Sequence, residues 1–318
     1  MDRYPNIRPW NYNRVKLQVA ENELDYVNAS DIILPEPTDE SKKPLRYIAM
    51  QGPTEPSFNY VWRMVAEQLS PQASIVQLTS MLEGGFIKCH QYFPFTEEES
   101  TWNLNEEDIW GDGWKATLTF ESLEEYADGA IEKRKLLLHV QGEEEPRVIW
   151  HFLFHCWPDF GVPDLGDLDS FFELMKLSRE HSDPEGTRII HCSAGVGRTG
   201  TFISIEHLLR ELDSDAFTDR EACPDNTDPV FDTVEELRQQ RRGMVQGAVQ
   251  FTFIYQVVRK LWQEKYSISD DRLRSGSEPA SKRLEVPELL ISDETDDDEM
   301  KSDDTDPASS EAGAARTG

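Results

Sequence analysis

The sequence of 318 residues is poor in cysteine and has no long apolar run. Its four cysteines are Cys89, Cys156, Cys192 and Cys223, and no two of them form a Cys-x-x-Cys pair. This low density excludes a disulfide-stabilised scaffold, so a reducing compartment inside the cell is expected. No apolar segment approaches the roughly 18 residues that a membrane span needs, and we therefore expect no membrane association.

Basic residues are also scarce, with 32 Lys and Arg against 61 Asp and Glu and a net charge of −29. Such an acidic chain is poorly suited to nucleic acid, which is bound by neutralising its phosphates. The seven histidines show no paired ligand spacing, so neither a metal site nor a cofactor is expected. The start, MDRYPNIRPWNYNR, lacks the basic-then-apolar order of a secretory signal. These features predict a cytoplasmic protein, with the nucleus as the alternative.

Residues 267–318 contain no aromatic side chain and are rich in Asp, Glu, Ser and Pro. Such a segment cannot bury enough apolar surface to offset its ordering entropy, and it is predicted to be a disordered acidic tail. Within it, LEVPELLI (284–291) is a candidate docking segment for a partner, the alternative being a solvated tail with incidental apolar residues. Ser292 and Thr295 lie among acidic residues and are candidate sites for an acidophilic kinase.

Residues 1–266 mix strand-like and helix-like segments and are predicted to form one catalytic domain. The strand candidates, rich in β-branched and aromatic residues, are YIAMQ, SIVQLT, FIKCHQYF, WKATLTFESL, KLLLHVQ, RVIWHFLFHCW and TRIIHC. Apolar residues at three- and four-residue spacing predict helices over 58–70, 168–181, 200–212, 230–241 and 250–265. Residues 213–229 are polar and indicate a loop. The pattern predicts an α/β fold, a single domain with a central twisted mixed sheet flanked by α-helices.

The stretch IIHCSAGVGRTGTF (189–202) indicates a binding loop between a buried strand and a helix that begins near Thr199. Its backbone N–H groups can converge on one point, and the helix N-terminus adds a partial positive charge, which suits phosphate. The loop lacks the Gly-Lys-Ser/Thr ending of a nucleotide-binding loop. The predicted phosphate-binding residues are Ser193, Ala194, Gly195, Val196, Gly197 and Arg198.

Cys192 ends the strand, and Arg198 follows it by six positions. A guanidinium can bind two phosphate oxygens at once, which an ammonium does less well. In such a setting the thiolate is favoured and the cysteine pKa falls below its free value of about 8.5. The pair therefore predicts phosphoryl transfer through a cysteinyl-phosphate intermediate. The alternative, a buried inert cysteine beside a tight turn, leaves Arg198 unexplained.

A phosphate monoester also needs a proton donor for its leaving group and a base for the attacking water, and one carboxyl group can do both. CWPDFGVP (156–163) supplies Asp159 in a loop with two prolines and a glycine. Trp157 is a candidate anchor and Gly161 a candidate hinge for closure of this loop over the substrate.

The sequence resembles the classical protein tyrosine phosphatases, in particular the non-receptor type with one catalytic domain. HCSAGVGRTGTF and WPDFGVP are similar to the family's signature and acid loops. The other matching stretches are DYVNAS, YIAMQGP, FIKCHQYFP and RRGMVQGAVQFTFIY, in the family's order, and the resemblance spans residues 3–266. It implies hydrolysis of phosphotyrosine in proteins, in intracellular signalling.

The resemblance also implies a role for each matching residue. Cys192 is the nucleophile, Arg198 binds phosphate, Asp159 is the general acid and then the base, and Thr199 assists departure of the thiolate. The remaining matches are Gln246 (positions water), Gln250 (second glutamine), Glu83 (orients the arginine), Lys88 (lysine of the same hairpin), Tyr4 (aromatic wall for phosphotyrosine), Asn6 (aspartate in many relatives) and His191 (precedes the nucleophile).

Relatives usually carry a few dozen residues before the segment that holds Tyr4, so the N-terminal part is expected to be short or missing. Two alternatives to an active tyrosine phosphatase stay open. One is a pseudophosphatase that binds phosphotyrosine without turnover, against which Cys192, Arg198 and Asp159 all argue. The other is a phosphatase with dual or lipid specificity, against which Tyr4 argues.

Overall fold

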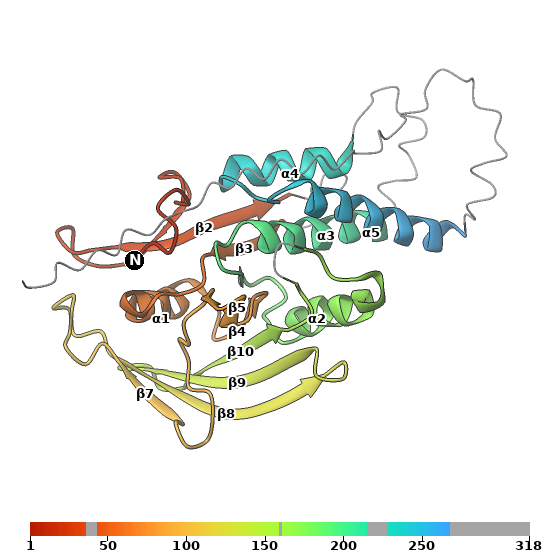
Figure 1. Cartoon of the computed structure of the whole chain (residues 1–318). Coiled ribbons are helices and arrows are strands. Elements are labelled where there is room, and N and C mark those ends of the chain that lie inside the picture. Colours follow the sequence, from red (N-terminus) through yellow and green to blue (C-terminus); the bar gives the residue numbers. More distant parts are fainter. Residues whose placement is uncertain (36–42, 159–160, 215–227, 268–318) are drawn as a thin grey trace, which may run out of the picture. The chain divides into compact units, whose positions relative to one another are not determined.

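The computed structural model describes residues 1–35, 43–158, 161–214 and 228–267 (Figure 1). Asp159, Cys223 and most of the expected loop over 213–229 lie outside the described residues. The expected acidic tail, with Ser292 and Thr295, lies outside them as well, apart from Ser267. The domain boundary after residue 266 therefore stays a prediction.

Within the described residues, nine strands form one mixed sheet (Figure 1). Its order is β1 (Arg14–Lys16), β2 (Tyr26–Leu34), β3 (Leu45–Met50), β11 (Arg188–His191), β4 (Gln72–Gln77), β10 (Arg147–Phe154), β9 (Ile131–Val140), β8 (Ala116–Tyr126) and β7 (Thr101–Leu104). The four central strands β3, β11, β4 and β10 are parallel, and the outer pairs are antiparallel. The mixed α/β sheet confirms the predicted fold class.

Alternation along the central strands buries both faces of the sheet. In β11, Ile190 belongs to one hydrophobic cluster and Ile189 to the other. In β3, Tyr47 packs on the side of Ile190 and Ile48 on the side of Ile189. A strand that is buried on both faces appears in the sequence as a continuous apolar run, as RIIHC does.

In the described part of the chain, five helices cover the two faces of the sheet. Those on the face of Ile190 are α2 (Leu168–Glu180), α3 (Gly197–Asp213), α4 (Pro229–Gln240) and α5 (Ala248–Tyr266), and Figure 1 shows α3, α4 and α5 side by side. Helix α1 (Phe58–Gln68) packs on the other face. Short 3₁₀ turns, η1 (Glu55–Ser57) and η2 (Leu165–Asp167), precede α1 and α2. All five predicted helices are confirmed, with ends that differ by at most three residues.

One predicted strand is largely wrong. Within FIKCHQYF only Phe86–Ile87 (β6) is a strand, and it pairs with Leu82–Glu83 (β5) in a short separate hairpin. The apolar residues that follow, Cys89, Tyr92 and Phe93, are buried from irregular chain. Their burial, and not a sheet, explains the apolar run.

The topology places Cys192 in the middle of the molecule. β11 lies between β3 and β4, in the parallel part of the sheet, and it ends at His191. Cys192 follows directly, and α3 begins five residues later at Gly197. Ligands of open α/β sheets bind at this carboxyl end of the strands, so the fold puts the predicted loop where a site is expected.

Replacement of Phe171 by alanine is expected to destabilise the fold by about 3–4 kcal/mol, because it leaves a cavity in the core. The Phe171 ring is fully buried and lies 5.5 Å from the Trp157 ring and 5.7 Å from the Phe202 ring, between centroids. Urea unfolding measures the loss. Phe231→Ala, at an exposed ring on α4, is the control and should change stability by less than about 0.5 kcal/mol; equal losses would contradict the packing described.

Candidate active site

Other segments of the chain hold the loop from Cys192 to Arg198 by donating hydrogen bonds to its carbonyl oxygens. The bonds run from Gly52 N to Ser193 O (2.8 Å), from Arg241 Nη2 to Ala194 O (3.2 Å), from Arg241 Nε to Gly195 O (2.8 Å) and from Val245 N to Val196 O (3.2 Å). In a planar trans peptide the next N–H points away from the carbonyl. The N–H groups of residues 194–197 are therefore directed toward the centre of the loop, where they can bind an anion.

Gly195 is required by the close packing of this loop against β3. Its φ is +69°, and a Cβ atom there would lie 2.0 Å from the carbonyl oxygen of Met50. Any other residue would push the loop away from the sheet and disturb the convergence of its amides.

Cys192 is buried at the end of β11, and the hydroxyl of Thr199 contacts its sulfur. Thr199 Oγ1 donates a hydrogen bond to Cys192 Sγ at 3.3 Å. The role of Thr199 in the departure of a thiolate stays a prediction.

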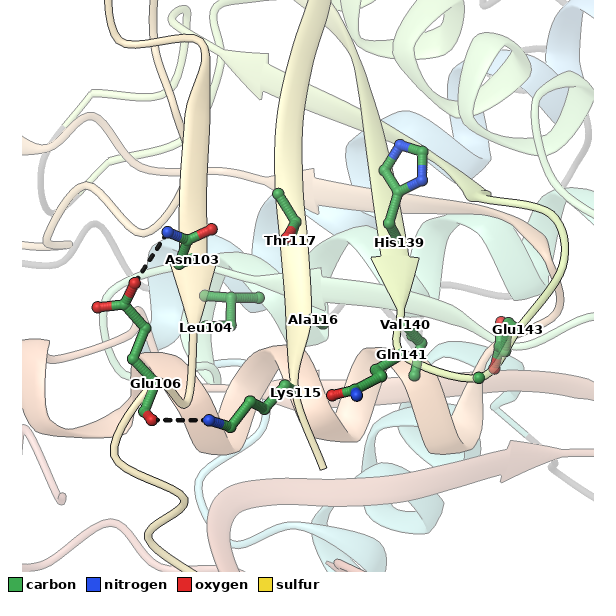
Figure 2. Close-up of a pocket in the computed structure, with 11 residues that line it drawn as sticks. Asn103, Leu104, Glu106, Lys115, Ala116, Thr117, His139, Val140, Gln141 and Glu143 are labelled. Carbon is green, nitrogen blue, oxygen red and sulfur yellow. Dashed lines mark hydrogen bonds between the residues drawn. The ribbon is translucent and has the colours of Figure 1, made fainter. Parts of the chain in front are cut away.

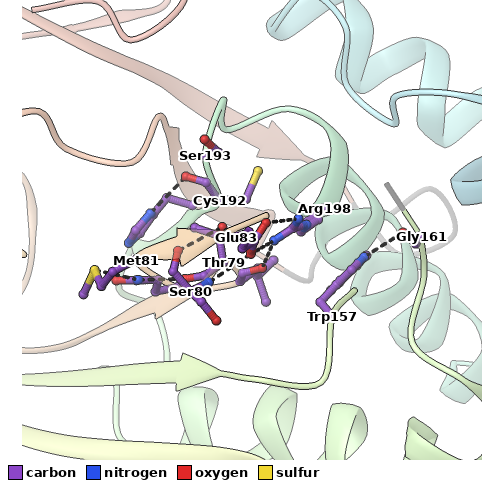
Figure 3. Close-up of polar contacts among 12 residues, drawn as sticks. Thr79, Ser80, Met81, Glu83, Trp157, Gly161, Cys192, Ser193 and Arg198 are labelled. Atoms are coloured by element: carbon purple, nitrogen blue, oxygen red, sulfur yellow. Dashed lines mark hydrogen bonds and ion pairs between the residues drawn. The ribbon is translucent and has the colours of Figure 1, made fainter. Parts of the chain in front are cut away.

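Arg198 forms a bidentate ion pair with Glu83, which Figure 3 shows. Its Nη1 and Nη2 atoms lie 2.6 and 2.7 Å from the two carboxylate oxygens, and Nη1 also donates to Leu78 O at 3.1 Å. Glu83 in turn accepts hydrogen bonds from Thr79 Oγ1 (2.8 Å) and Ser80 N (3.1 Å). Burial alone would raise the pKa of Glu83, but the hydrogen bonds and charge of Arg198, together with the hydrogen bonds from Thr79 and Ser80, lower that pKa below its ordinary value. The carboxylate therefore stays charged and sets the orientation of the guanidinium.

The two predicted glutamines lie against the loop. A Cβ atom placed on Gly197 would be 3.0 Å from Gln250 Oε1 and 3.2 Å from Gln246 Cβ. Gln250 Oε1 accepts a hydrogen bond from Gln246 N at 3.0 Å, so the buried glutamine positions the exposed one.

Tyr4 reaches the same loop from the start of the chain. Its hydroxyl lies 2.8 Å from Ser193 Oγ, within hydrogen-bonding distance. Asn6 is exposed in a turn that Ile7 N closes by donating to Tyr4 O at 3.2 Å.

The predicted acid loop is described on both sides of residues 159–160. Trp157 is buried, and its Nε1 donates to Gly161 O at 3.0 Å (Figure 3). The Trp157 ring also packs on Phe171, and its role as an anchor stays a prediction. Lys88 leaves the β5–β6 hairpin with its backbone N bound to Met81 O at 2.9 Å.

The model of one protein family, Protein-tyrosine phosphatase, matches residues 1–260. Among curated proteins the chain is 37% identical over 259 residues to receptor-type tyrosine-protein phosphatase epsilon of Rattus norvegicus, covering 80% of this chain and 32% of that protein. It is 34% identical over 270 residues to Phosphatidylinositol phosphatase PTPRQ of Homo sapiens (84% and 10%) and 32% identical over 266 residues to receptor-type tyrosine-protein phosphatase H of Homo sapiens (83% and 21%). The chain belongs to the protein-tyrosine phosphatase family. It spans about a tenth to a third of the length of these relatives.

In this protein-tyrosine phosphatase domain, a series of hydrogen-bonded, buried side chains continues behind Cys192. His191 Nδ1 lies 3.3 Å from Cys192 O, and its Nε2 lies 2.8 Å from the hydroxyl of Tyr92. That hydroxyl is 3.1 Å from His151 Nε2, which is also 3.2 Å from Gln77 Oε1. The bonds are consistent with one set of protons, in which His151 donates to Tyr92, Tyr92 to His191, and His191 to the carbonyl of Cys192.

His151 and His191 are both neutral at physiological pH. Burial lowers the pKa of His191 to about 3. Burial, together with the positive charge of Arg134, lowers the pKa of His151 well below its ordinary value. Of the two, only His191 was among the sequence-based candidates; Tyr92 lay in the motif FIKCHQYFP, and no pattern distinguished His151 from an ordinary strand residue.

Arg241 is the other supporting residue that the sequence did not identify. It is fully buried and also donates to Asn28 Oδ1 (2.8 Å) and Ser30 Oγ (3.1 Å), in addition to its two bonds to the loop. Burial lowers its pKa to about 10, so the guanidinium keeps its charge. The motif RRGMVQG could have pointed to Arg241, but the sequence does not show which of its two arginines is buried.

A hollow of about 620 Å³ lies away from this site, over the ends of β7, β8 and β9 (Figure 2). Its polar side chains bind neighbouring atoms: Asn103 Nδ2 donates to Glu106 Oε1 at 2.8 Å, and Lys115 Nζ donates to Glu106 O at 3.0 Å. It contains no cysteine or paired carboxylates, and it offers no alternative to the loop at Cys192.

None of the helices in the described part of the chain combines the length and the apolar character needed to cross a membrane.

Arg241→Met is expected to lower stability by roughly 3 kcal/mol, because it leaves two loop carbonyls and two strand side chains without their donor. Turnover should fall with it, since the amides of the loop lose their alignment. Arg242→Met, at the exposed neighbour, is the matched control and should change little. Urea unfolding and phosphate release on both variants measure this, and a similar effect of the two changes would refute the assignment.

His151→Gln is expected to flatten the dependence of stability on pH. In the wild type the unfolded state takes up a proton at this histidine below about pH 6.5 and the folded state does not, so stability falls as pH decreases. Removal of that proton uptake should reduce the slope by about 1 kcal/mol per pH unit between roughly pH 5 and 6. Urea unfolding at several pH values tests it. An unchanged slope would show that His151 is protonated in the folded protein.

Proposed function

We propose that the chain hydrolyses phosphotyrosine in proteins through a cysteinyl-phosphate intermediate. The observation that supports the proposal is one short loop with Cys192 at its start and Arg198 at its end, whose carbonyls are bonded from outside so that the amides of residues 194–197 face inward. In this proposal the phosphate binds to these amides and to Arg198, next to the Cys192 nucleophile.

In the first step the Cys192 thiolate attacks phosphorus, and the bond from phosphorus to the tyrosyl oxygen breaks. The electron pair of that bond goes to the tyrosyl oxygen, which takes a proton from Asp159. Arg198 and the loop amides stabilise the charge on the phosphoryl oxygens during transfer. Glu83 keeps the guanidinium in the plane that binds two of those oxygens.

In the second step a water molecule attacks phosphorus, and the bond to sulfur breaks. Asp159, now a carboxylate, accepts a proton from the water, and Gln246 orients that water with Gln250 behind it. The sulfur leaves as a thiolate with the electron pair of that bond, and Thr199 stabilises it through the hydrogen bond at 3.3 Å while keeping its own proton. Inorganic phosphate and the starting form of the enzyme result.

Tyr4 is the residue that selects tyrosine in this proposal. Its ring forms one wall of the cleft, and its hydroxyl contact to Ser193 fixes the wall against the loop. A phosphoserine side chain is too short to reach the sulfur past such a wall. Asn6 takes the place of the residue that holds the substrate backbone.

Phosphoinositide hydrolysis is the second candidate, because one relative at 34% identity is named a phosphatidylinositol phosphatase. Tyr4 favours the phosphotyrosine substrate over it. A pseudophosphatase is disfavoured because the sequence retains Cys192, Arg198 and Asp159.

The wider context is part of the same proposal. We place the chain in intracellular signalling, in the cytoplasm with the nucleus as the alternative, as a non-receptor phosphatase without membrane association. The segment 284–291 is the proposed docking site for a partner, and Ser292 and Thr295 are the proposed targets of an acidophilic kinase.

Phosphate release from a phosphotyrosyl peptide, its phosphoseryl twin and a soluble phosphoinositide tests the function. Of these three substrates, only the phosphotyrosyl peptide should be hydrolysed. Cys192→Ser should abolish turnover, and Asp159→Ala should slow it by about 10²- to 10⁴-fold, the usual contribution of a positioned acid. Hydrolysis of the phosphoinositide alone would assign the second candidate. Binding of the phosphotyrosyl peptide without turnover would assign a pseudophosphatase.

A further inference from the structure

The β5–β6 hairpin carries exposed apolar side chains next to the site. Leu82, Phe86 and Ile87 are 60%, 71% and 55% exposed. Gly84 and Gly85 form its two-residue turn with φ values of +56° and +82°, as in a type I′ hairpin, which favours glycine at both positions. Large apolar side chains are thus exposed on both faces of a small element next to the site, where they are available for contact with a ligand.

Only one of the three side chains lies on the face of the hairpin that meets the active site. Glu83 pairs with Phe86 across the hairpin, and Leu82 pairs with Ile87. Paired residues project to the same face, with Cβ atoms about 5 Å apart. Because Glu83 holds Arg198 through both carboxylate oxygens, Phe86 lies on the face toward the phosphate-binding arginine. Leu82 and Ile87 lie on the opposite face.

The hairpin is also joined to the segment that carries Tyr4. Arg3 Nη1 donates to Ile87 O at 3.0 Å, and the same guanidinium donates to Gly52 O at 3.1 Å and Pro53 O at 2.8 Å. Phe86 and the proposed tyrosine wall therefore belong to one rim around the loop. A peptide whose phosphotyrosine enters that rim must pass close to the hairpin.

The surroundings of the hairpin tip leave room for such a peptide. A Cβ atom added at Gly84 or Gly85 would meet nothing within 4 Å. The charge of the chain makes apolar contact useful, because residues 1–266 hold 46 Asp and Glu against 26 Lys and Arg. Acidic segments flanking a phosphotyrosine are repelled by such a protein, whereas apolar ones are not.

We infer that Phe86 selects substrates by contact with an apolar side chain that flanks the phosphotyrosine. The inference rests on the proposed function and adds a substrate preference to it. Phe86 takes no part in the chemistry. Its ring gives the peptide an apolar surface beside the mouth of the site, and a polar or acidic residue at the same peptide position loses that contact.

The test uses phosphotyrosyl peptides in pairs that differ by Leu or Ser at one position within three residues of the phosphotyrosine, together with a small aryl phosphate. The wild type should prefer the Leu peptide by about tenfold in kcat/KM for at least one position, the usual effect of a modest apolar contact. Phe86→Ser should reduce that preference below about twofold, with hydrolysis of the aryl phosphate unchanged.

Two controls separate contact from distortion. Leu82→Ser removes an exposed apolar side chain from the other face of the same hairpin. Phe231→Ser repeats the exchange of phenylalanine for serine at an exposed position on α4. Both should keep the preference. Its loss in Leu82→Ser as well would overturn the assignment, because the hairpin and not the Phe86 ring would then be responsible.

The remaining outcomes distinguish the inference from the function on which it rests. A wild type that hydrolyses the aryl phosphate but treats Leu and Ser peptides alike would refute the inference and leave the function intact. A wild type inactive on every substrate would refute both. A dimer that Phe86→Ser converts to monomer, with the peptide preference unaltered, would assign the ring to contact with a second copy of the chain and overturn the inference.

Discussion

The carbonyl oxygens of residues 193–196 need hydrogen-bond donors, and these donors must approach from outside the loop. The inner side, which the N–H groups of residues 194–197 face, then stays open. A buried carbonyl without a partner costs about as much as a lost hydrogen bond, and the loop is too short to provide its own donors. Gly52, Arg241 and Val245, which lie far from the loop in the sequence, donate to these carbonyls, and Gly200 N in the first turn of α3 is a second donor to Val196 O. The active site is therefore a property of the whole fold, because the loop cannot keep its shape without these segments.

A second constraint is the orientation of Arg198. A free guanidinium on a flexible stem would lose conformational entropy on binding each phosphate, whereas the pair with Glu83 removes that freedom beforehand. Glu83 is in turn held by Thr79 and Ser80. The arginine and its support come from different elements, α3 and the β5–β6 hairpin, so the position of the hairpin matters for chemistry that occurs elsewhere.

The sequence was sufficient for the central part of the site and much less so for its support. Cys192, Arg198 and Thr199 occur in one contiguous motif, and the motif's glycines indicate its shape. Strand β2 was missed because polar residues interrupt its apolar pattern. Two of them, Asn28 and Ser30, are buried acceptors for Arg241. The same residues that hide the strand in the sequence hold the loop in place, and only the spatial pairing of residues more than 200 positions apart shows it.

Arg241 also bears on how so acidic a chain would bind the dianion of the proposed substrate. The charge of Arg198 is largely balanced by Glu83, and this pair alone leaves little net positive potential at the site. The hydrogen-bond partners of Arg241 are all neutral: two carbonyls, an amide oxygen and a hydroxyl. Burial lowers its pKa to about 10, and the neighbouring Cys192 acts in the opposite direction. Opposite charges stabilise each other strongly in a poorly solvated interior, while the distant surface carboxylates are screened beyond about 10 Å. A buried cation without a bonded carboxylate, placed directly behind the loop, can therefore supply the local positive potential that the rest of the surface opposes.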